Sequence, residues 1–255
     1  MEALYQQELF VPISLCDREG KLAPEAAFSL FMDLASVHAQ LLGVGAEDML
    51  RRGLFWLTVK TKVRFHRRPK LMERVSVSTR PLAPEKIRSV REYRIEQDGA
   101  PLVEGKTEWA VMETASGKIH PMADVFPGDL ELAKEPAFPA PFSRIDPDFS
   151  GAEALGSFRV RSVDVDIGGH MNNVAYLRAV FGVLSSAELA AMPKREIEII
   201  FRAPCFEGEE LRVLRRVTPG GWDLTALRPD GAPAVLIRAA GEALAPQGTS
   251  KTAAE

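Results

Sequence analysis

The chain has 255 residues, of which 46% are hydrophobic and 26% charged, and its formal net charge is −3. This composition is that of an ordinary soluble globular protein and offers no overall basicity that would recruit nucleic acid. No apolar run approaches the ~20 residues that cross a bilayer, and residues 1–8 lack the basic-then-apolar order of a signal peptide, so we expect a cytoplasmic protein.

The first half of the sequence predicts one long helix followed by an antiparallel sheet. Weak alternation over residues 8–16 indicates a strand, and turn residues follow at 17–21. Pro24 suits the first turn of a helix, and apolar residues then cover nearly every face of residues 26–42, as in a helix surrounded by protein. This half is completed by a short helix at 46–52 and by strands at 54–65, 74–82, 87–97 and 101–113.

A Pro-rich stretch over residues 121–151 shows no periodicity and predicts a linker, after which the order of elements repeats. The second half predicts a strand at 157–165 and a helix at 172–192. Its further strands are predicted at 195–202, 210–217, 222–228 and 234–244. We therefore divide the chain into a first domain (1–120), a linker (121–155), a second domain (156–245) and a disordered tail (246–255).

Short runs of residues recur at matching places in the two halves. Asp98-Gly99-Ala100-Pro101 recurs as Asp230-Gly231-Ala232-Pro233, displaced by 230 − 98 = 132 residues, each time before the last strand of its half. The apolar run that ends at Phe65 aligns with the one that ends at Phe201, displaced by 201 − 65 = 136. Matches at the same place in the same element order favour an internal duplication over chance.

A strand-to-helix corner in the second half, residues 164–176, gathers polar residues that suit acyl chemistry. The first backbone N–H groups of a helix have no internal partners and carry the positive end of its dipole, so they can stabilise an oxygen that gains negative charge. Gly169 lets a substrate carbonyl approach this backbone, and Asp166 supplies a carboxylate nearby. Because these residue types are also ordinary turn and cap residues, a purely structural loop is the alternative.

The equivalent corner of the first half keeps the turn but loses the polar set. Aligning Asp17 with Asp166 puts Gly20 on Gly169. The positions of His170, Asn172 and Asn173 are then taken by Lys21, Ala23 and Pro24. This difference makes the second copy the candidate active half and the first the half that shapes an acyl pocket, with drift after duplication as the alternative.

No motif for metal or cofactor chemistry occurs in the sequence. Cys16 and Cys205 lie far apart, and the 4 histidines show no metal-ligand spacing. The sequence contains no GxSxG elbow, P-loop or GxGxxG run. We therefore expect no metal and no cofactor, and neither a serine hydrolase of the GxSxG type nor a nucleotide-binding protein.

The corner pattern Asp-x-Asp-x-x-Gly-His-x-Asn-Asn-x-x-Tyr, over residues 164–176, resembles the signature of hotdog-fold thioesterases. With its two similar halves, the chain over residues 5–245 resembles the acyl-acyl-carrier-protein (acyl-ACP) thioesterases. Gly43-Val44-Gly45, Met49 and residues 52–57 are similar to that family's segment between helix and sheet. The resemblance implies an α+β tandem (double) hotdog fold, each half a sheet wrapped around a helix. It also implies hydrolysis of fatty acyl-ACP thioesters to free fatty acid and holo-ACP.

The resemblance implies Asp166 as catalytic aspartate and His170 as catalytic histidine. Plant members of the family carry Asn where this chain has Gly168, and a glutamate where it has Pro204. Asp166 would activate a water or attack the carbonyl itself, and His170 would orient it or only fix the start of the helix. We expect the oxyanion and substrate-binding positions at Gly169, Met171, Asn172 and Asn173. Possible pocket residues are Trp56, Tyr176 and Cys205, of which Tyr176 and Cys205 are also typical core residues.

Acyl carrier protein is the partner that the resemblance implies, and because it is acidic a basic surface is expected opposite it. Candidate runs are Arg64, His66, Arg67, Arg68 and Lys70, and Lys194, Arg195, Arg212, Arg215 and Arg216, with solvated strand faces as the alternative. An acyl-CoA thioesterase or a non-catalytic acyl-thioester-binding protein remains possible at the same corner. A hydratase is disfavoured, since the helix after Asn173 carries only Glu188 as a carboxylate. The chain could act as a monomer or homodimer.

Overall fold

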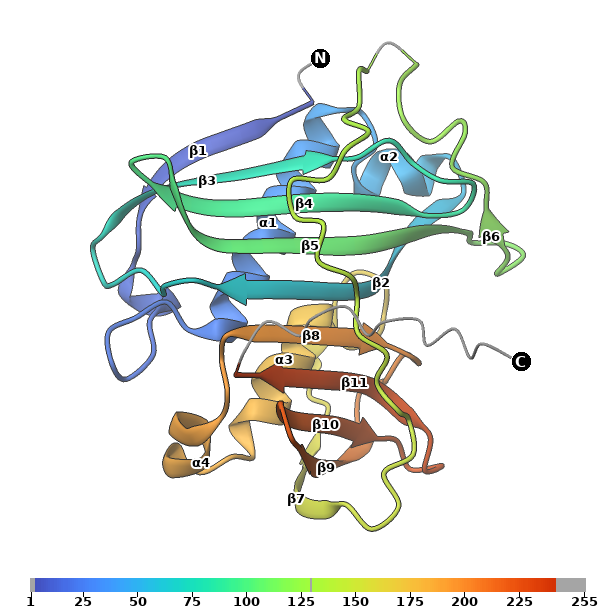
Figure 1. Cartoon of the computed structure of the whole chain (residues 1–255). Coiled ribbons are helices and arrows are strands. Elements are labelled where there is room, and N and C mark those ends of the chain that lie inside the picture. Colours follow the sequence, from blue (N-terminus) through green and yellow to red (C-terminus); the bar gives the residue numbers. More distant parts are fainter. Residues whose placement is uncertain (1–2, 129, 242–255) are drawn as a thin grey trace, which may run out of the picture.

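The structure is a computed structural model that describes residues 3–128 and 130–241. These residues form one 11-stranded antiparallel sheet in the order β1-β3-β4-β5-β2-β8-β11-β10-β9-β7, with β6 beside β5 (Figure 1). The first half contributes β1 (Tyr5–Phe10), β2 (Leu54–Phe65), β3 (Arg74–Pro81), β4 (Ser89–Gln97), β5 (Ala100–Glu113) and β6 (Ile119–His120). The second contributes β7 (Glu153–Arg159), β8 (Glu196–Phe201), β9 (Glu210–Thr218), β10 (Gly221–Leu227) and β11 (Pro233–Ala240).

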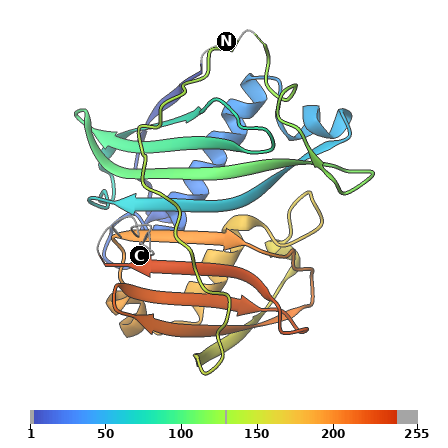
Figure 2. The same ribbon diagram turned by 45° about the vertical axis from the view of Figure 1, so that its right-hand side comes forward.

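Helices cover one face of this sheet (Figure 2). α1 (Pro24–Leu41) and α2 (Ala46–Arg51) belong to the first half, and α3 (Asn173–Gly182) and α4 (Ser186–Ala191) to the second. α1 packs so tightly on β5 that a Cβ on Gly105 would lie 2.6 Å from the Phe31 ring. Each half is thus a sheet wrapped around a buried helix, which confirms the expected α+β double hotdog architecture.

Four of the predicted elements differ from the structure. The strand expected at 8–16 ends at Phe10 and is followed by a 3₁₀ turn, η1 (Ile13–Leu15). The strand expected at 157–165 ends at Arg159 and is followed by η2 (Ser162–Asp164). The helix expected at 172–192 is broken after Gly182, because Ser185 caps α4 in a capping box with Glu188. The strand expected at 234–244 ends at Ala240, and the tail at 246–255 lies outside the described residues.

The strand register reveals an internal two-fold relation at the junction of the halves. β2 and β8 pair with Lys62 opposite Glu198, flanked by the pairs Val63 with Ile197 and Thr61 with Ile199. Adding the displacement of 136 found in the sequence turns residue 62 into 198, and exchanges the two flanking pairs. The local two-fold axis therefore passes between Lys62 and Glu198, as an internal duplication requires.

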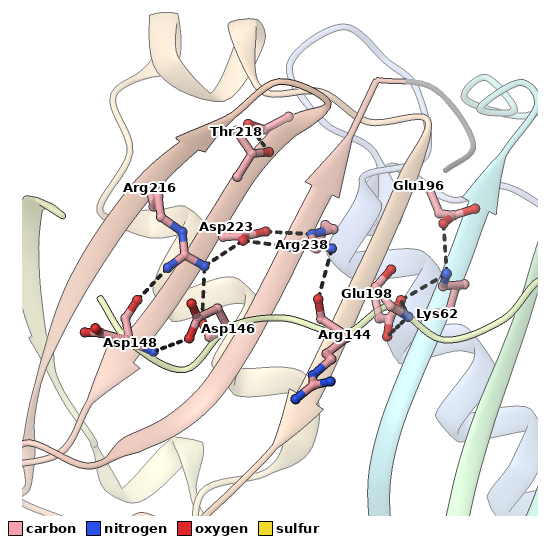
Figure 3. Close-up of polar contacts among 12 residues, drawn as sticks. Lys62, Arg144, Asp146, Asp148, Glu196, Glu198, Arg216, Thr218, Asp223 and Arg238 are labelled. Atoms are coloured by element: carbon pink, nitrogen blue, oxygen red, sulfur yellow. Dashed lines mark hydrogen bonds and ion pairs between the residues drawn. The ribbon is translucent and has the colours of Figure 1, made fainter. Parts of the chain in front are cut away.

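The segment between the halves crosses the outer face of the sheet, opposite the helices (Figures 1 and 2). Buried charges hold it there: both oxygens of Glu198 accept the Ser143 N–H at 2.9 Å, and Lys62 donates to the Pro141 carbonyl. Further along, Arg216 donates to the carbonyls of Asp146 and Asp148 (Figure 3). The Pro-rich segment is thus an ordered strip that covers charged strand residues.

Among the residues that the structure describes, no helix is long and apolar enough to cross a membrane. None of their His, Cys, Asp and Glu side chains cluster in a way that could hold a metal ion.

Lys62 offers a direct test of the junction. It lies 3.0 Å from both Glu196 and Glu198, and all three side chains are nearly inaccessible. We expect Lys62→Met to lower the free energy of unfolding by about 3 kcal/mol, because buried carboxylates lose their cation. Urea denaturation of Lys62→Met, Glu198→Met and the double variant measures this. The double variant should recover most of the loss, and a loss equal to the sum of the two single variants would contradict the coupling.

Candidate active site

The corner that joins β7 to α3 is shaped by its own backbone hydrogen bonds. The Asp166 N–H donates to the His170 carbonyl and the Gly169 N–H donates to the Asp166 carbonyl, both at 3.0 Å. Gly169 adopts a φ of 75°, a left-handed conformation that glycine accepts without steric cost. Asn172 then caps α3, its side chain accepting the Val174 N–H at 2.9 Å. Local turn chemistry therefore fixes where Asp166 and the helix start lie.

Asp166 and His170 converge over Gly168. Asp166 Oδ1 accepts the Gly168 N–H at 2.8 Å and lies 4.0 Å from His170 Nδ1. His170 Nδ1 also donates to the Met171 carbonyl at 3.4 Å. A Cβ on Gly168 would lie 3.0 Å from both Asp166 Oδ1 and His170 Nε2, and 3.1 Å from the Phe55 ring. Because residue 168 has no side chain, the carboxylate and the imidazole can share one small space.

Asp166 lines a cavity of about 670 Å³. The polar rim comes from the second half, with Asp166, Asn172 and Asn173. The walls come from the first half and are mainly apolar, contributed by Met32, Ala35 and Ala39 of α1, Met49 of α2, and Phe55 and Trp56 of β2. Neither half forms this cavity alone, so the polar corner and the apolar walls depend on how the halves are joined.

Asn173 connects the corner to the opposite half, since its Nδ2 donates to Thr58 Oγ1 of β2 at 2.7 Å. The backbone amides divide into two groups. Those of Gly169, Met171 and Asn172 donate to the carbonyls of Asp166, Cys205 and Asp164. The Asn173 N–H, at the first position of α3, donates to none of the residues that the structure describes. Of the four expected oxyanion positions, the backbone of Asn173 alone presents a free donor within this part of the chain.

Tyr176 and Cys205 lie away from the cavity, in the core of the second half. Burial raises the pKa of the Tyr176 hydroxyl, and desolvation likewise raises the pKa of the Cys205 thiol, so both stay protonated near neutral pH. Met171 is also a core residue, 1% exposed. Trp56 does line the cavity, and its indole N–H donates to the Val44 carbonyl at 2.9 Å.

The corner of the first half has a similar backbone, but its aspartate is paired with an arginine. η1 and a bridge between Cys16 and Leu22 match η2 and the bridge between Val165 and Met171. Asp17 there forms an ion pair with Arg68. Burial raises the pKa of Asp17, but hydrogen bonds from Arg68 and from the Lys21 and Glu19 amides outweigh it and leave the pKa lowered. The first aspartate is thus a structural anion, whereas no ion pair with Lys or Arg holds Asp166 in the described residues.

The basic runs singled out in the sequence are largely neutralised. Arg64 pairs with Glu196, Arg67 with Glu73 and Arg215 with Glu153. Sequence reasoning also missed the cavity residues Ser89, Arg91 and Trp109, and Thr58, which holds Asn173, because alternation in a strand does not tell which inward positions face empty space.

Comparisons with known proteins match the sequence and the fold of this chain to one family. Sequence models of the acyl-ACP thioesterase N-terminal and C-terminal domains match residues 2–127 and 150–232. The structure resembles an acyl-ACP thioesterase from Bacteroides thetaiotaomicron, with a TM-score of 0.82 and 16% identity over 93% of this chain and 97% of that one. It also resembles the 12:0-ACP thioesterase from Umbellularia californica, with a TM-score of 0.79 and 18% identity over 93% and 96% of the two chains. No curated protein matches the sequence.

The two domain matches follow each other in the order of the two halves and leave uncovered residue 1, residues 128–149 of the linker, and residues 233–255, which begin with β11. Together with the double hotdog fold, they establish that the chain belongs to the acyl-ACP thioesterase family.

Proposed function

We propose that this acyl-ACP thioesterase hydrolyses its substrate at the mouth of the cavity between the halves, with Asp166 as the acid-base residue. The observation that carries the proposal is the pairing, on one cavity rim, of the Asp166 carboxylate with the free N–H of Asn173 at the start of α3. A carboxylate can take a proton from water, and a helix N-terminus can stabilise a developing oxyanion.

The proposed reaction uses these groups in sequence. The thioester carbonyl oxygen accepts the Asn173 N–H while the acyl chain lies along the apolar walls. Asp166 takes a proton from a water whose oxygen attacks the carbonyl carbon. The tetrahedral intermediate then collapses, the C–S bond breaks, and the departing thiolate takes up the proton held by Asp166, so that the thiol and the fatty acid leave and the carboxylate is restored. Because a thiolate is a good leaving group near neutral pH, no strong acid is needed at the sulfur.

His170 acts in this scheme as a positioning residue. Its Nδ1 donates to the Met171 carbonyl, which leaves Nε2 as an acceptor on the side that faces Gly168. At this place Nε2 can accept a hydrogen bond from the second O–H group of the attacking water, which orients the water while that proton stays on it.

We further propose that the chain works in the cytoplasm as a monomer. Both cysteines, Cys16 and Cys205, are free thiols, which supports a reducing compartment. The β2 to β8 pairing joins the two halves within one chain, so the site needs no second copy.

Asp166→Asn tests the catalytic assignment. The amide keeps an oxygen to accept the Gly168 N–H but cannot take a proton, so kcat should fall on the order of 10²-fold or more. Thiol release from a panel of acyl-ACP and acyl-CoA thioesters measures it. The control is Asp17→Asn at the equivalent corner, which should lower stability because Arg68 loses its partner, and leave kcat of the folded enzyme unchanged. An equally active Asp166→Asn enzyme would remove Asp166 from the mechanism.

The two adjacent glycines should respond differently to alanine. In Gly168→Ala the new Cβ fills the space shared by Asp166 and His170, so kcat should fall about 10-fold or more with little change in melting temperature. In Gly169→Ala the Cβ meets no atom within 4 Å but must adopt φ near 75°, so stability should fall by about 1 kcal/mol. Thermal melts and kinetics on both variants check this, and a fully active Gly168→Ala would argue against a shared water site.

A further inference from the structure

One cavity residue has no part in the reaction proposed above, and it carries a charge. Arg91 of β4 is 5% exposed and lines the cavity. Within residues 3–128 and 130–241, no Asp or Glu forms an ion pair with it. Most other buried charges of the described residues are paired, as Lys62 is with Glu198 and Asp223 is with Arg238, and Lys106 lies over the rings of Phe138 and Phe142. A buried guanidinium without an anion is costly, so its retention in a binding cavity points to a ligand.

Only one of the three nitrogens of the Arg91 guanidinium donates to the part of the protein that the structure describes. Nη1 donates to His38 Nδ1 at 2.9 Å and to Thr79 Oγ1 at 3.3 Å. Neither Nε nor Nη2 donates to any residue that the structure describes. Burial lowers the pKa of Arg91, which is the cost of an uncompensated charge. The free edge that joins Nε and Nη2 is the fork that binds a carboxylate with two parallel hydrogen bonds.

One further polar residue, Ser89, accompanies this edge of the cavity. Ser89 and Trp109 both line the cavity and lie directly opposite each other on β4 and β5. The indole N–H of Trp109 is fully buried beside the Tyr93 hydroxyl, so it is the ring of Trp109, and not its N–H, that faces the cavity. An otherwise apolar pocket thus has a second polar end, apart from the one around Asp166.

The strand register gives the separation of the two ends. Thr58, which holds Asn173, pairs with Trp109, and Trp109 pairs with Ser89, two residues from Arg91 along β4. Two strand spacings and two residues along a strand place the Cα atoms of Thr58 and Arg91 about 12 Å apart. A short or medium-length acyl chain can therefore reach from the thioester end to Arg91.

We propose that the cavity accepts acyl groups that end in a carboxylate, the half-thioesters of α,ω-dicarboxylic acids, with the distal carboxylate bound by Nε and Nη2 of Arg91. This inference rests on the proposed hydrolysis for its reaction and on Arg91 for its substrate class. A carboxylate fits better than a hydroxyl or ketone because it neutralises the buried charge and can accept from both nitrogens.

The test compares acyl groups of equal length. Adipoyl, suberoyl and sebacoyl thioesters are set against hexanoyl, octanoyl and decanoyl thioesters of the same carrier, and kcat/KM is measured for each. We expect the wild-type enzyme to favour the carboxylate-ended member of at least one pair by about 10-fold or more. Equal rates, or a preference for the methyl-ended member in all three pairs, would overturn the proposal.

Variants of Arg91 locate the effect. Arg91→Met replaces the charge by an apolar side chain and should reverse the preference, while Arg91→Lys keeps the charge without the fork and should retain part of it. Arg94→Met is the matched control, since Arg94 lies on the outer face of the same strand and pairs with Glu104. Because each comparison is a ratio measured on one protein sample, partial misfolding does not alter it. An unchanged ratio in Arg91→Met would remove Arg91 from substrate selection.

Binding without turnover separates this inference from the proposed function. If neither class of thioester is hydrolysed, the proposed function fails, and the melting temperature with free suberate or octanoate still reports on Arg91. Stabilisation by suberate that is larger than by octanoate, and lost in Arg91→Met, supports the carboxylate site. Equal stabilisation by the two acids contradicts it.

Discussion

The structure depends on the pairing of β2 with β8, and at the centre of that pairing Lys62 lies between Glu196 and Glu198. A residue on a two-fold axis of two identical subunits would meet its own copy, so a buried charge there would face a like charge. Because the two halves belong to one chain, the two positions could diverge to Lys and Glu. The same two charged residues also bind the linker, because Glu198 accepts the Ser143 N–H and Lys62 donates to the Pro141 carbonyl. One buried cluster thus fixes both the junction and the covering segment.

The junction determines the site, because the corner of the second half is complete only against the sheet of the first. The hydrogen bond from Asn173 to Thr58 joins the two across it. The halves have since taken different tasks: the first aspartate, Asp17, is neutralised by Arg68, whereas Asp166 faces the cavity. The helices differ as well, with 18 residues in α1 and 10 in α3, so the longer helix and its sheet provide the cavity walls and the shorter one begins at the polar part of the cavity.

The sequence allowed the fold and the corner to be predicted because both follow from local rules. Alternation identified most strands, and the spacing of Asp166, Gly169 and Asn172 fixed a turn with its cap, as the hydrogen bonds now show. The errors arose where local signals conflict. Val163 looks like a strand residue yet is 86% exposed in a 3₁₀ turn. The cavity could not be predicted, because its volume depends on how side chains from several elements pack in three dimensions, and the sequence does not give that packing. Arg91 in particular is a charged residue in a strand, which would ordinarily be expected on the outer face of the sheet, but its side chain lines the cavity on the inner face.

Gly168 shows how a departure from the family pattern is compatible with the same chemistry. Plant members carry Asn at this position, whose side chain could orient the neighbouring carboxylate. In this chain the backbone N–H of Gly168 itself donates to Asp166 Oδ1 at 2.8 Å. The space of the missing side chain is bordered by the Phe55 ring, which also stands edge-on to His170 with 6.2 Å between ring centroids. Because a backbone donor orients Asp166 and an aromatic ring limits the space beside it, the position needs no side chain of its own.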